Sequence, residues 1–598
     1  MKQMRVSAAI KILQHITLGL GAVLVAALPG ETAERITFAF GPIERSIELA
    51  DLDRLAQEGV LSDDLAYYTK FLPDDYDLDE VRRALTWRVE QDIDTIDLDV
   101  VILDRFFYTE QGKYLLNIAA DFIRTEARRS DLRALRGALL VAIADKKEGL
   151  TLLNTVRQFP SPEMRIELDR GLGLLREIDR AIYETEAAID LLERLGTPIG
   201  DLSPERQASL RSLANQAQQP GRYQVERQPL SRNAPIPADI YLPTLQGQRQ
   251  RNRPTVIISH GLGSDRTSYG YLGRHLASHG FVTINVEHPG SNGEQINALL
   301  VGQSATVVAN EEFTERPWQI SALLNYLERE ATQYGNLINF AQVGVVGQSF
   351  GGYTALALSG ASINFDALRA SCPPSSLSLN VSLLLQCQAG QLAEPNQTTL
   401  SLQDGRVRAA IAINPITSVL FGEASMGQIT TPTMIVASGA DTVAPALQEQ
   451  LVPFTWLTQP DRYLLLMRQG THFSTIAVTG SEAFDLPAEI IGPDPEVAQD
   501  YLKASSLAFL TLHLSNDITY QPLLTAEGTI QLNETAIDLT LIQNLTVPAL
   551  VDQLGGPPRS AADAVETPIN ATSGSPSPDV MLEDLQRPTF FAPSPSSP

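Results

Sequence analysis

The sequence predicts an α/β protein in which a mostly parallel sheet, covered by helices on both faces, follows a mainly helical N-terminal domain. From residue 222 onward, short apolar runs alternate with longer segments of helical periodicity, as in parallel strands that are buried on both faces. Across residues 34–215, apolar residues instead recur three and four positions apart, which is typical of amphipathic helices. A length of 598 residues with 43% hydrophobic content allows more than one folded unit.

The first residues predict export. A basic start up to Lys11 is followed by an apolar run at 16–28 and a Pro-Gly break, which is the layout of a secretory signal peptide. The run is shorter than the roughly 20 residues that span a bilayer. We expect a signal peptide at 1–33 and export to a periplasm, a lumen or the medium. Because Glu31 fits the cleavage site poorly, an uncleaved N-terminal anchor is the alternative.

The remaining chain divides by composition into successive segments. They are a helical, acidic N-terminal domain (34–215), a polar linker (216–221), the α/β domain (222–520) with an insertion at 360–405, a C-terminal extension (521–554) and a Pro- and Ser-rich tail (555–598). The tail composition predicts disorder. The predicted strands of the α/β domain are Thr255–Ser259, Phe281–Val286, Val343–Gly347, Val407–Ile413, Thr433–Ser438 and Arg462–Met467.

Charge and cysteine content exclude several classes of function. The formal net charge of −25 argues against nucleic-acid binding, because a phosphate backbone requires a surplus of Lys and Arg. Two cysteines are too few for a multi-Cys zinc module or a disulfide-dense miniprotein. We expect neither a metal nor an organic cofactor.

The segment Gly347-Gln348-Ser349-Phe350-Gly351 carries the sharpest functional signal. A G-x-S-x-G string is weak by itself, but here a buried-strand run precedes it and a helical segment follows it. This strand–turn–helix setting is that of the nucleophile elbow in the α/β-hydrolase fold. We therefore expect that fold, with Ser349 as the nucleophile.

A serine hydroxyl needs a neighbouring base, and the base needs an orienting carboxylate. In this fold both follow the nucleophile along the chain, and the acid comes first. Two histidines follow Ser349: His472, in a loop directly after a predicted strand, and His513, inside the closing helix. Asp441 follows the preceding strand, whereas the competing Asp461 begins a strand and belongs to the wrong edge of the sheet. The predicted triad is Ser349, Asp441 and His472.

An oxyanion requires two backbone N–H donors that are already in place. Phe350, directly after the nucleophile, supplies one. The other is expected from the loop His260-Gly261-Leu262-Gly263 after an early strand, with Leu262 as the donor. No Gly-Lys-Ser/Thr follows, so this is not a phosphate-binding loop. For His260 we expect a structural role at the strand end, with a catalytic role as the alternative.

Four motifs resemble the platelet-activating-factor acetylhydrolases, an α/β-hydrolase family that cleaves short or oxidised acyl chains from phospholipids. The resemblance covers about residues 240–475 and implies Ser349 and His472 as nucleophile and base, and Leu262 and Phe350 as oxyanion-hole donors. It implies an activity like that of a 1-alkyl-2-acetylglycerophosphocholine esterase in lipid breakdown, with contact to lipid surfaces. The motifs are Ile258-Ser-His-Gly-Leu-Gly, Leu276-Ala-Ser-His-Gly-Phe-Val, Val286-Glu-His and Gly347-Gln-Ser-Phe-Gly-Gly.

One position departs from that family. Its animal members take the catalytic acid from the strand after the nucleophile helix, where this chain has Asn414. Asparagine carries no charge, so Asp441, one strand later, is expected to serve, which is the more general α/β-hydrolase arrangement and argues against a narrow acetylhydrolase specificity. The whole layout also resembles a group of predicted hydrolases from photosynthetic bacteria whose N-terminal domain has no known function.

The function expected from these residues is that of a secreted serine ester hydrolase, a lipase or carboxylesterase acting on short-acyl phospholipids or small acyl esters. A serine peptidase or broad carboxylesterase on the same triad is one alternative. The other is an inactive hydrolase scaffold whose N-terminal domain binds a partner protein.

The insertion contains both cysteines, Cys372 and Cys387. In an exported protein they can form a disulfide, and two free thiols are the alternative. The insertion leaves the sheet directly after the nucleophile helix, so we expect it to form part of the pocket wall. The leucines expected to offer apolar surface to an acyl chain are Leu377, Leu379, Leu383, Leu384 and Leu385.

Overall fold

A computed structural model describes residues 32–40, 43–68, 78–88, 100–128, 130–198, 200, 202–329, 334, 336–372, 380–478 and 488–558. The predicted signal peptide, apart from its last two residues, lies outside the described residues. So do the predicted tail from residue 559 onward and Leu377 and Leu379 of the insertion. The chain forms two compact units, which divide between Gly173 and Leu174.

The first unit consists mostly of helices, as predicted, but it also contains a four-stranded sheet in the order β2-β1-β4-β3. Only the β1–β4 pair is parallel. The strands are β1 (Arg35–Phe40), β2 (Ile43–Glu48), β3 (Ile123–Thr125) and β4 (Glu163–Glu167). The helices are α2 (Leu49–Glu58), α3 (Asp63–Tyr68), α4 (Leu78–Thr86), α5 (Val100–Tyr108), α6 (Glu110–Phe122), α7 (Leu132–Ala144) and α8 (Leu152–Arg157).

The division between the units falls within the long helix α9 (Leu168–Leu195). Ile189 and Leu192 of α9 are buried in the core of the second unit. The next helix, α10 (Pro204–Gln218), also belongs to the second unit. Its residues Ala214 and Ala217 pack in a core cluster that also contains residues of the closing helix, α20. The compact division therefore lies earlier in the chain than the polar linker predicted at 216–221.

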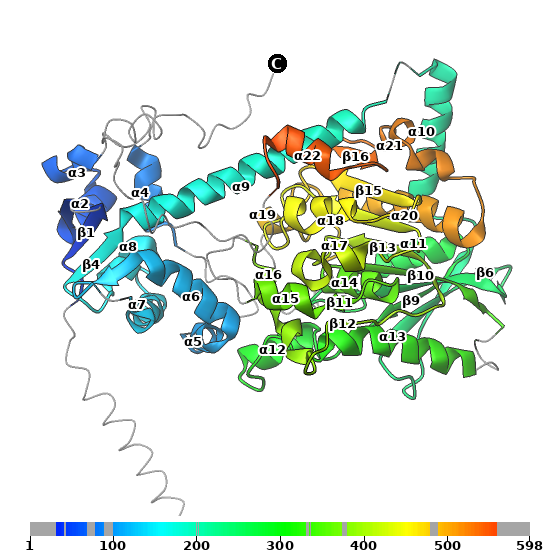
Figure 1. Ribbon diagram of the computed structural model, residues 1–598, viewed down its shortest axis with the longest axis horizontal. Coiled ribbons are helices and arrows are strands. Elements are labelled where there is room, and N and C mark those ends of the chain that lie inside the picture. Colours follow the sequence, from blue (N-terminus) through cyan, green and yellow to red (C-terminus); the bar gives the residue numbers. More distant parts are fainter. Residues whose placement is uncertain are drawn as a thin grey trace, which may run out of the picture. The chain divides into compact units, whose positions relative to one another are not determined.

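The second unit is built on a ten-stranded sheet in the order β16-β15-β14-β13-β10-β8-β9-β6-β5, with β7 paired to β6 (Figure 1). The strands from β9 through β15 in this order are parallel, and those at the two edges are antiparallel. The strands are β5 (Gln224–Pro229), β6 (Ala238–Leu245), β7 (Gln248–Arg249), β8 (Arg253–Ser259), β9 (Val282–Val286), β10 (Ile338–Gln348), β13 (Val407–Ile413), β14 (Thr433–Ser438), β15 (Arg462–Met467) and β16 (Leu539–Ile542). The six predicted runs correspond to β8, β9, β10, β13, β14 and β15, so the predicted α/β-hydrolase fold is confirmed.

Both faces of this sheet are covered by helices, which explains why its strands are continuously apolar (Figure 1). Because side chains alternate along a strand, Leu464 and Leu466 of β15 enter one core cluster and Leu465 and Met467 enter another. The longer helices are α11 (Gly270–Ser278), α12 (Gly293–Leu300), α13 (Glu312–Arg329), α14 (Phe350–Leu358), α17 (Ser418–Met426), α20 (Pro495–Ser515) and α22 (Val547–Leu554).

The predicted insertion at 360–405 contains a small two-stranded sheet of its own, and the predicted C-terminal extension contributes β16 to the edge of the main sheet. The strands of the small sheet are β11 (Ile363–Asn364) and β12 (Thr399–Leu400). The shorter helices are α15 (Phe365–Ser371), α16 (Leu383–Gln386), α18 (Val452–Thr455), α19 (Ala488–Ile491) and α21 (Ala526–Thr529), with 3-10 turns at Cys387–Leu392 and Gln521–Leu524 and a π turn at Leu447–Leu451.

Among the helices that the structure describes, none combines the length and the apolar character needed to cross a membrane.

Candidate active site

The predicted functional residues follow the carboxyl ends of parallel strands. Ser349 comes directly after β10, Asp441 after β14, His472 after β15, and the loop containing Leu262 after β8. These strands all belong to the parallel part of the sheet, in which β13 separates β10 from β14, so their carboxyl ends lie at one edge. In open α/β sheets this is the edge at which ligands bind.

Ser349 occupies a strained turn between β10 and α14. Its backbone has φ 53° and ψ −114°, a conformation that costs a non-glycine residue of order 1–3 kcal/mol. The turn is held by its neighbours, since the Ser349 N–H donates to the Ile413 carbonyl at the end of β13, at 2.8 Å. Strain of this kind persists only where the surrounding structure enforces it, and it is concentrated at functional sites.

Two glycines make this turn sterically feasible. A Cβ atom at Gly347 would lie 2.0 Å from the carbonyl oxygen of Gly351, and one at Gly351 would lie 2.1 Å from the carbonyl oxygen of Ser259. Both obstacles are backbone atoms, so no side-chain rotation could relieve them. The G-x-S-x-G pattern therefore reflects close approach of strand β10, helix α14 and strand β8.

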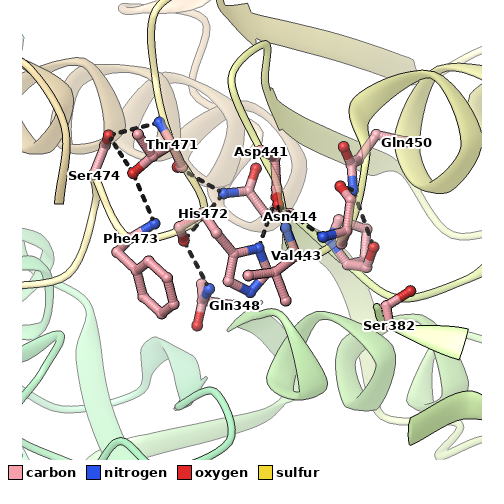
Figure 2. A network of polar contacts seen from close by, with 12 residues as sticks. Gln348, Ser382, Asn414, Asp441, Val443, Gln450, Thr471, His472, Phe473 and Ser474 are labelled. Atoms are coloured by element: carbon pink, nitrogen blue, oxygen red, sulfur yellow. Dashed lines mark hydrogen bonds and ion pairs between the residues drawn. The ribbon is translucent and has the colours of Figure 1, made fainter. Parts of the chain in front are cut away.

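His472 and Asp441 form a buried pair. The Nδ1 atom of His472 lies 2.7 Å from Oδ2 of Asp441 (Figure 2). The other carboxylate oxygen accepts hydrogen bonds from the N–H groups of Val443 and Ala444, at 2.9 and 2.7 Å. Because an ionised carboxylate only accepts, the proton of the imidazole is held on Nδ1, and Nε2 keeps a lone pair. An imidazole in this tautomer is able to take a proton through Nε2.

The loop that carries His472 is anchored by two side chains, Gln348 and Asn414, whose contacts with this loop were not predicted from the sequence. The amide of Gln348, next to the nucleophile, donates to the carbonyl of His472 at 3.1 Å (Figure 2). The amide of Asn414 donates to the carbonyls of His472 and Thr471, at 3.3 and 3.4 Å. Each is a polar residue that directly follows the apolar end of a strand, after Val343–Gly347 in β10 and after Ala409–Ile413 in β13, which is the sequence signal that could have identified them. The side chain of Asn414 thus bonds to the backbone of the histidine loop, whereas the carboxylate of Asp441 contacts the imidazole ring of His472.

The loop after β8 is built around His260. The Nδ1 atom of His260 lies 2.7 Å from the carbonyl oxygen of Gly261, and Nε2 accepts from the N–H of His288 at 3.0 Å. Burial, with the nearby positive charge of Arg316, lowers the pKa of His260 to about 3, so the ring is neutral at ordinary pH. Both ring nitrogens of His260 are therefore engaged in hydrogen bonds to backbone groups. These bonds hold the loop in place, which is the structural role expected for this residue.

The two predicted oxyanion-hole donors belong to different elements of the second unit. Phe350 is the first residue of α14, and the N–H groups of a helix's first turn have no acceptor within the helix. Leu262 lies in the loop after β8 and packs partly against the core. The next residue, Gly263, has a positive φ of 76° and donates its N–H to the carbonyl of Ser291 at 2.9 Å, which turns the chain at this point.

The insertion is attached beside Asp441 through the buried side chain of Glu449, which the sequence analysis did not identify. One carboxylate oxygen accepts from the side chains of Asn380, Gln386 and Ser418, at 2.5, 2.9 and 2.5 Å. The other accepts from the N–H groups of Thr417 and Ser418, at 2.7 and 2.9 Å. The carboxylate thereby joins the insertion to the first turn of α17.

Two further bonds connect this cluster to the loop of the predicted acid. The N–H of Ser382, in the insertion, donates to the carbonyl of Val443 at 3.0 Å. The amide of Gln450, the neighbour of Glu449, donates to the carbonyl of Ala444 at 3.0 Å. Figure 2 shows Ser382, Val443 and Gln450 next to Asp441. The backbone that positions the carboxylate is therefore held in part by the insertion.

Cys372 and Cys387 form a disulfide whose Cα atoms lie 5.5 Å apart. The structure therefore contains the disulfide, which was one of the two alternatives expected from the sequence. The bond joins the two ends of the segment that includes Ser382. Leu383 of this segment is buried in the core, so it is not available to an acyl chain as expected from the sequence. Leu384 and Leu385 remain partly exposed.

Comparison with known proteins gives two matches to family models, one in each compact unit. A model described as an alpha/beta hydrolase of unknown function (DUF1400) matches residues 32–167. A second model, platelet-activating factor acetylhydrolase, isoform II, matches residues 238–312, which extend from β6 through the Leu262 loop to the start of α13.

Similar curated proteins include three that are named platelet-activating factor acetylhydrolase. That of Cavia porcellus is 25% identical over 320 residues, 47% of this chain and 62% of the relative. Those of Canis lupus familiaris and Bos taurus are 28% and 27% identical, over 20% and 17% of this chain. The chain spans only 31% to 62% of the length of these relatives. Together with the fold, these matches make the chain an α/β-hydrolase similar to the platelet-activating factor acetylhydrolases.

The close approach at the elbow leads to a stability prediction. Gly347→Ala and Gly351→Ala should each lower the free energy of unfolding of the second unit by about 2–4 kcal/mol, because the added methyl group collides with backbone. Gly405→Ala is the matched control, since nothing lies within 4 Å of a Cβ at that position. It should change stability by less than about 0.5 kcal/mol. Urea unfolding followed by tryptophan fluorescence measures all three, and equal stability of the elbow and control variants would contradict this account.

Proposed function

We propose that this α/β-hydrolase is an exported serine esterase that cleaves short-acyl phospholipids or small acyl esters through an acyl-enzyme intermediate. The observation that carries the proposal is the combination of a strained serine at the β10–α14 turn with a buried His472–Asp441 pair at the same edge of the sheet. A serine nucleophile, a base with a free lone pair and an orienting carboxylate are the components that acyl transfer requires. The likeness to platelet-activating factor acetylhydrolases supports the ester substrate.

In the proposed mechanism, Oγ of Ser349 attacks the ester carbonyl while Nε2 of His472 takes the hydroxyl proton. The carboxylate of Asp441 stabilises the imidazolium that forms. The N–H groups of Phe350 and Leu262 donate to the carbonyl oxygen as it becomes negative. His472 then gives the proton to the leaving alcohol, and the acyl group stays on Ser349. A water molecule, deprotonated by His472, releases the acid and restores the hydroxyl.

Export is supported by two observations of different kind. The first 33 residues have the layout of a signal peptide, and the chain contains a disulfide. Disulfides persist in oxidising compartments and are rare in the cytosol. The proposal therefore places the enzyme outside the cytosol, in contact with exported or membrane-derived lipid esters.

The nucleophile and base are tested by Ser349→Ala and His472→Ala. Each variant should lose ester hydrolysis by a factor on the order of 10⁴–10⁶ in kcat while remaining folded, since triad members act as a unit. The measurements are turnover of p-nitrophenyl acetate and labelling by a fluorophosphonate, which should modify the wild-type protein at Ser349 alone. Labelling of the wild type also distinguishes an enzyme from an inactive scaffold. Wild-type turnover by Ser349→Ala would contradict the assignment.

The choice of acid is tested by comparing Asp441→Asn with Asn414→Ala. Asp441→Asn should lower kcat on the order of 10³–10⁴-fold, because the amide cannot stabilise the imidazolium and favours the wrong tautomer. Asn414→Ala removes two long hydrogen bonds to the histidine loop and should lower kcat by less than about tenfold. The opposite ranking would point to position 414 as the functional counterpart of the family's acid.

The substrate class is tested with a panel of acyl esters of graded chain length that includes a phospholipid with an acetyl group at its second position. The proposal predicts that short acyl groups on a glycerophospholipid are cleaved with a higher kcat/KM than long ones. Preference for a peptide or anilide bond would instead favour a peptidase on the same triad.

The disulfide is tested in the double variant Cys372→Ser/Cys387→Ser. The bond restrains a segment that contacts the Asp441 loop through Ser382 and Glu449. We expect the variant to change KM or chain-length preference toward long esters by about three- to tenfold, while kcat toward p-nitrophenyl acetate changes less. Mass spectrometry of non-reduced peptides should find the two cysteines linked in wild type. Free thiols together with unchanged kinetics on all esters would contradict this role.

A further inference from the structure

The second unit buries one complete guanidinium group that the mechanism above does not use. Arg316, on α13, has no exposed surface and is the largest of the fully buried side chains among the described residues. Burial lowers its pKa to about 10, so the group remains charged at ordinary pH. An uncompensated charge in the interior costs several kcal/mol. The position of this group therefore calls for an explanation.

The contacts of Arg316 lead to the two elements that carry the proposed oxyanion-hole donors. Its Nη1 donates to the carbonyl of His260 at 2.8 Å, and Nη2 lies 3.5 Å from the carbonyl oxygen of Gly261. The guanidinium carbon lies 4.4 Å from the ring centroid of Phe350, within the range of a cation–π contact. One side chain thus touches both the loop before Leu262 and the residue after the nucleophile.

The remaining contacts of Arg316 hold it in place. Its Nε donates to Oγ of Ser291 at 2.8 Å, and Ser291 donates to the Glu312 carboxylate at 2.5 Å. Oε2 of Glu312 lies 3.7 Å from the guanidinium and compensates its charge. Ser291 also accepts the N–H of Gly263 through its carbonyl, so the same cluster reaches the far side of Leu262.

Because the peptide bond is planar, the contacts of the Gly261 carbonyl also determine the direction in which the Leu262 N–H points. In a trans peptide the carbonyl and the following N–H point in opposite directions. The carbonyl of Gly261 is drawn toward Nδ1 of His260, at 2.7 Å, and toward Arg316. The N–H of Leu262, which belongs to the same peptide unit, must therefore point away from Arg316.

We propose that Arg316 is a positioning residue for the oxyanion hole, which locks the loop before Leu262 and the ring of Phe350 to one rigid group. The inference rests on the proposed function, because the oxyanion hole is defined by it. Arg316 touches neither substrate nor the reacting atoms and acts through the two amides. Its planar fork is essential, since the N–H groups along its edge reach two successive carbonyls while the guanidinium lies over an aromatic ring.

The test compares three variants of the full-length protein. Arg316→Lys keeps the charge opposite Glu312 but cannot bind two carbonyls and stack at once. Arg316→Met/Glu312→Gln removes both buried charges together, so that neither is left unpaired. Arg406→Met is the matched control: Arg406 makes two bonds to Asp404 at 2.9 and 2.6 Å, but it precedes β13 and so lies at the opposite end of the strands. Circular dichroism and thermal unfolding identify the folded variants.

Both Arg316 variants should lower kcat for p-nitrophenyl acetate by about 10- to 100-fold with KM within about threefold of wild type, because the amides act mainly on the transition state. The inhibition constant of a trifluoromethyl ketone, whose hemiketal oxyanion occupies the same amides, should rise by a similar factor. The pH midpoint of kcat/KM should not move, because the His472–Asp441 pair is untouched. Arg406→Met should match wild type in all of these quantities.

Two outcomes would overturn the inference. One is that folded Arg316→Lys and the double variant keep kcat within about threefold of wild type. The other is that their loss of kcat comes with a shifted pH midpoint and an unchanged inhibition constant, which would mean that the triad had been disturbed instead. An active wild type with active Arg316 variants refutes this inference alone. A wild type that neither turns over esters nor reacts with a fluorophosphonate refutes the proposed function as well.

Discussion

The turn between β10 and α14 depends on two positions that cannot carry a Cβ atom, and the other parts of the site are arranged around it. A Cβ at Gly347 would collide with the helix that follows, and one at Gly351 with the end of β8. This close approach brings Ser349 next to the carboxyl ends of β8 and β13. The loop of Leu262 and the side chain of Asn414 begin at those ends, so the same contact determines where the proposed oxyanion hole and the histidine anchor lie.

Around this turn the loops that carry the proposed catalytic residues are bonded, through their backbone, to side chains from other parts of the chain. Gln348 holds the carbonyl of His472, Arg316 that of His260, and Glu449 the N–H groups at the start of α17. The sheet beneath them is apolar and buried, and these polar side chains find their partners in the backbone of the neighbouring segments. A buried polar group left without a partner is costly, so breaking any of these hydrogen bonds would be unfavourable and the segments that they join are held in place.

The candidate site, and the side chains that hydrogen-bond to its loops, belong to the second compact unit. The proposed catalytic and positioning residues all lie between Leu174 and residue 558, and the disulfide-linked insertion belongs to the same unit. The family model that covers residues 32–167 matches the other unit, whereas the acetylhydrolase model matches the unit that contains the sheet. The chemistry proposed for this chain thus rests on residues of one unit.

Local patterns in the sequence were sufficient to predict the six parallel strands, the elbow at Ser349 and the pairing of His472 with a carboxylate at position 441. These features follow from strand burial and from chain order, both of which are visible along the chain. The four-stranded sheet of the first unit was missed because its short strands lie among helical segments and β1 pairs with β4, whose partner residues are 128 positions away. Arg316, Glu449 and the anchoring role of Gln348 were decided only by the tertiary structure. Their partners lie 56, 69 and 124 residues away in the chain. A contact between residues so far apart leaves no local pattern in the sequence, and only the folded chain brings the two partners together.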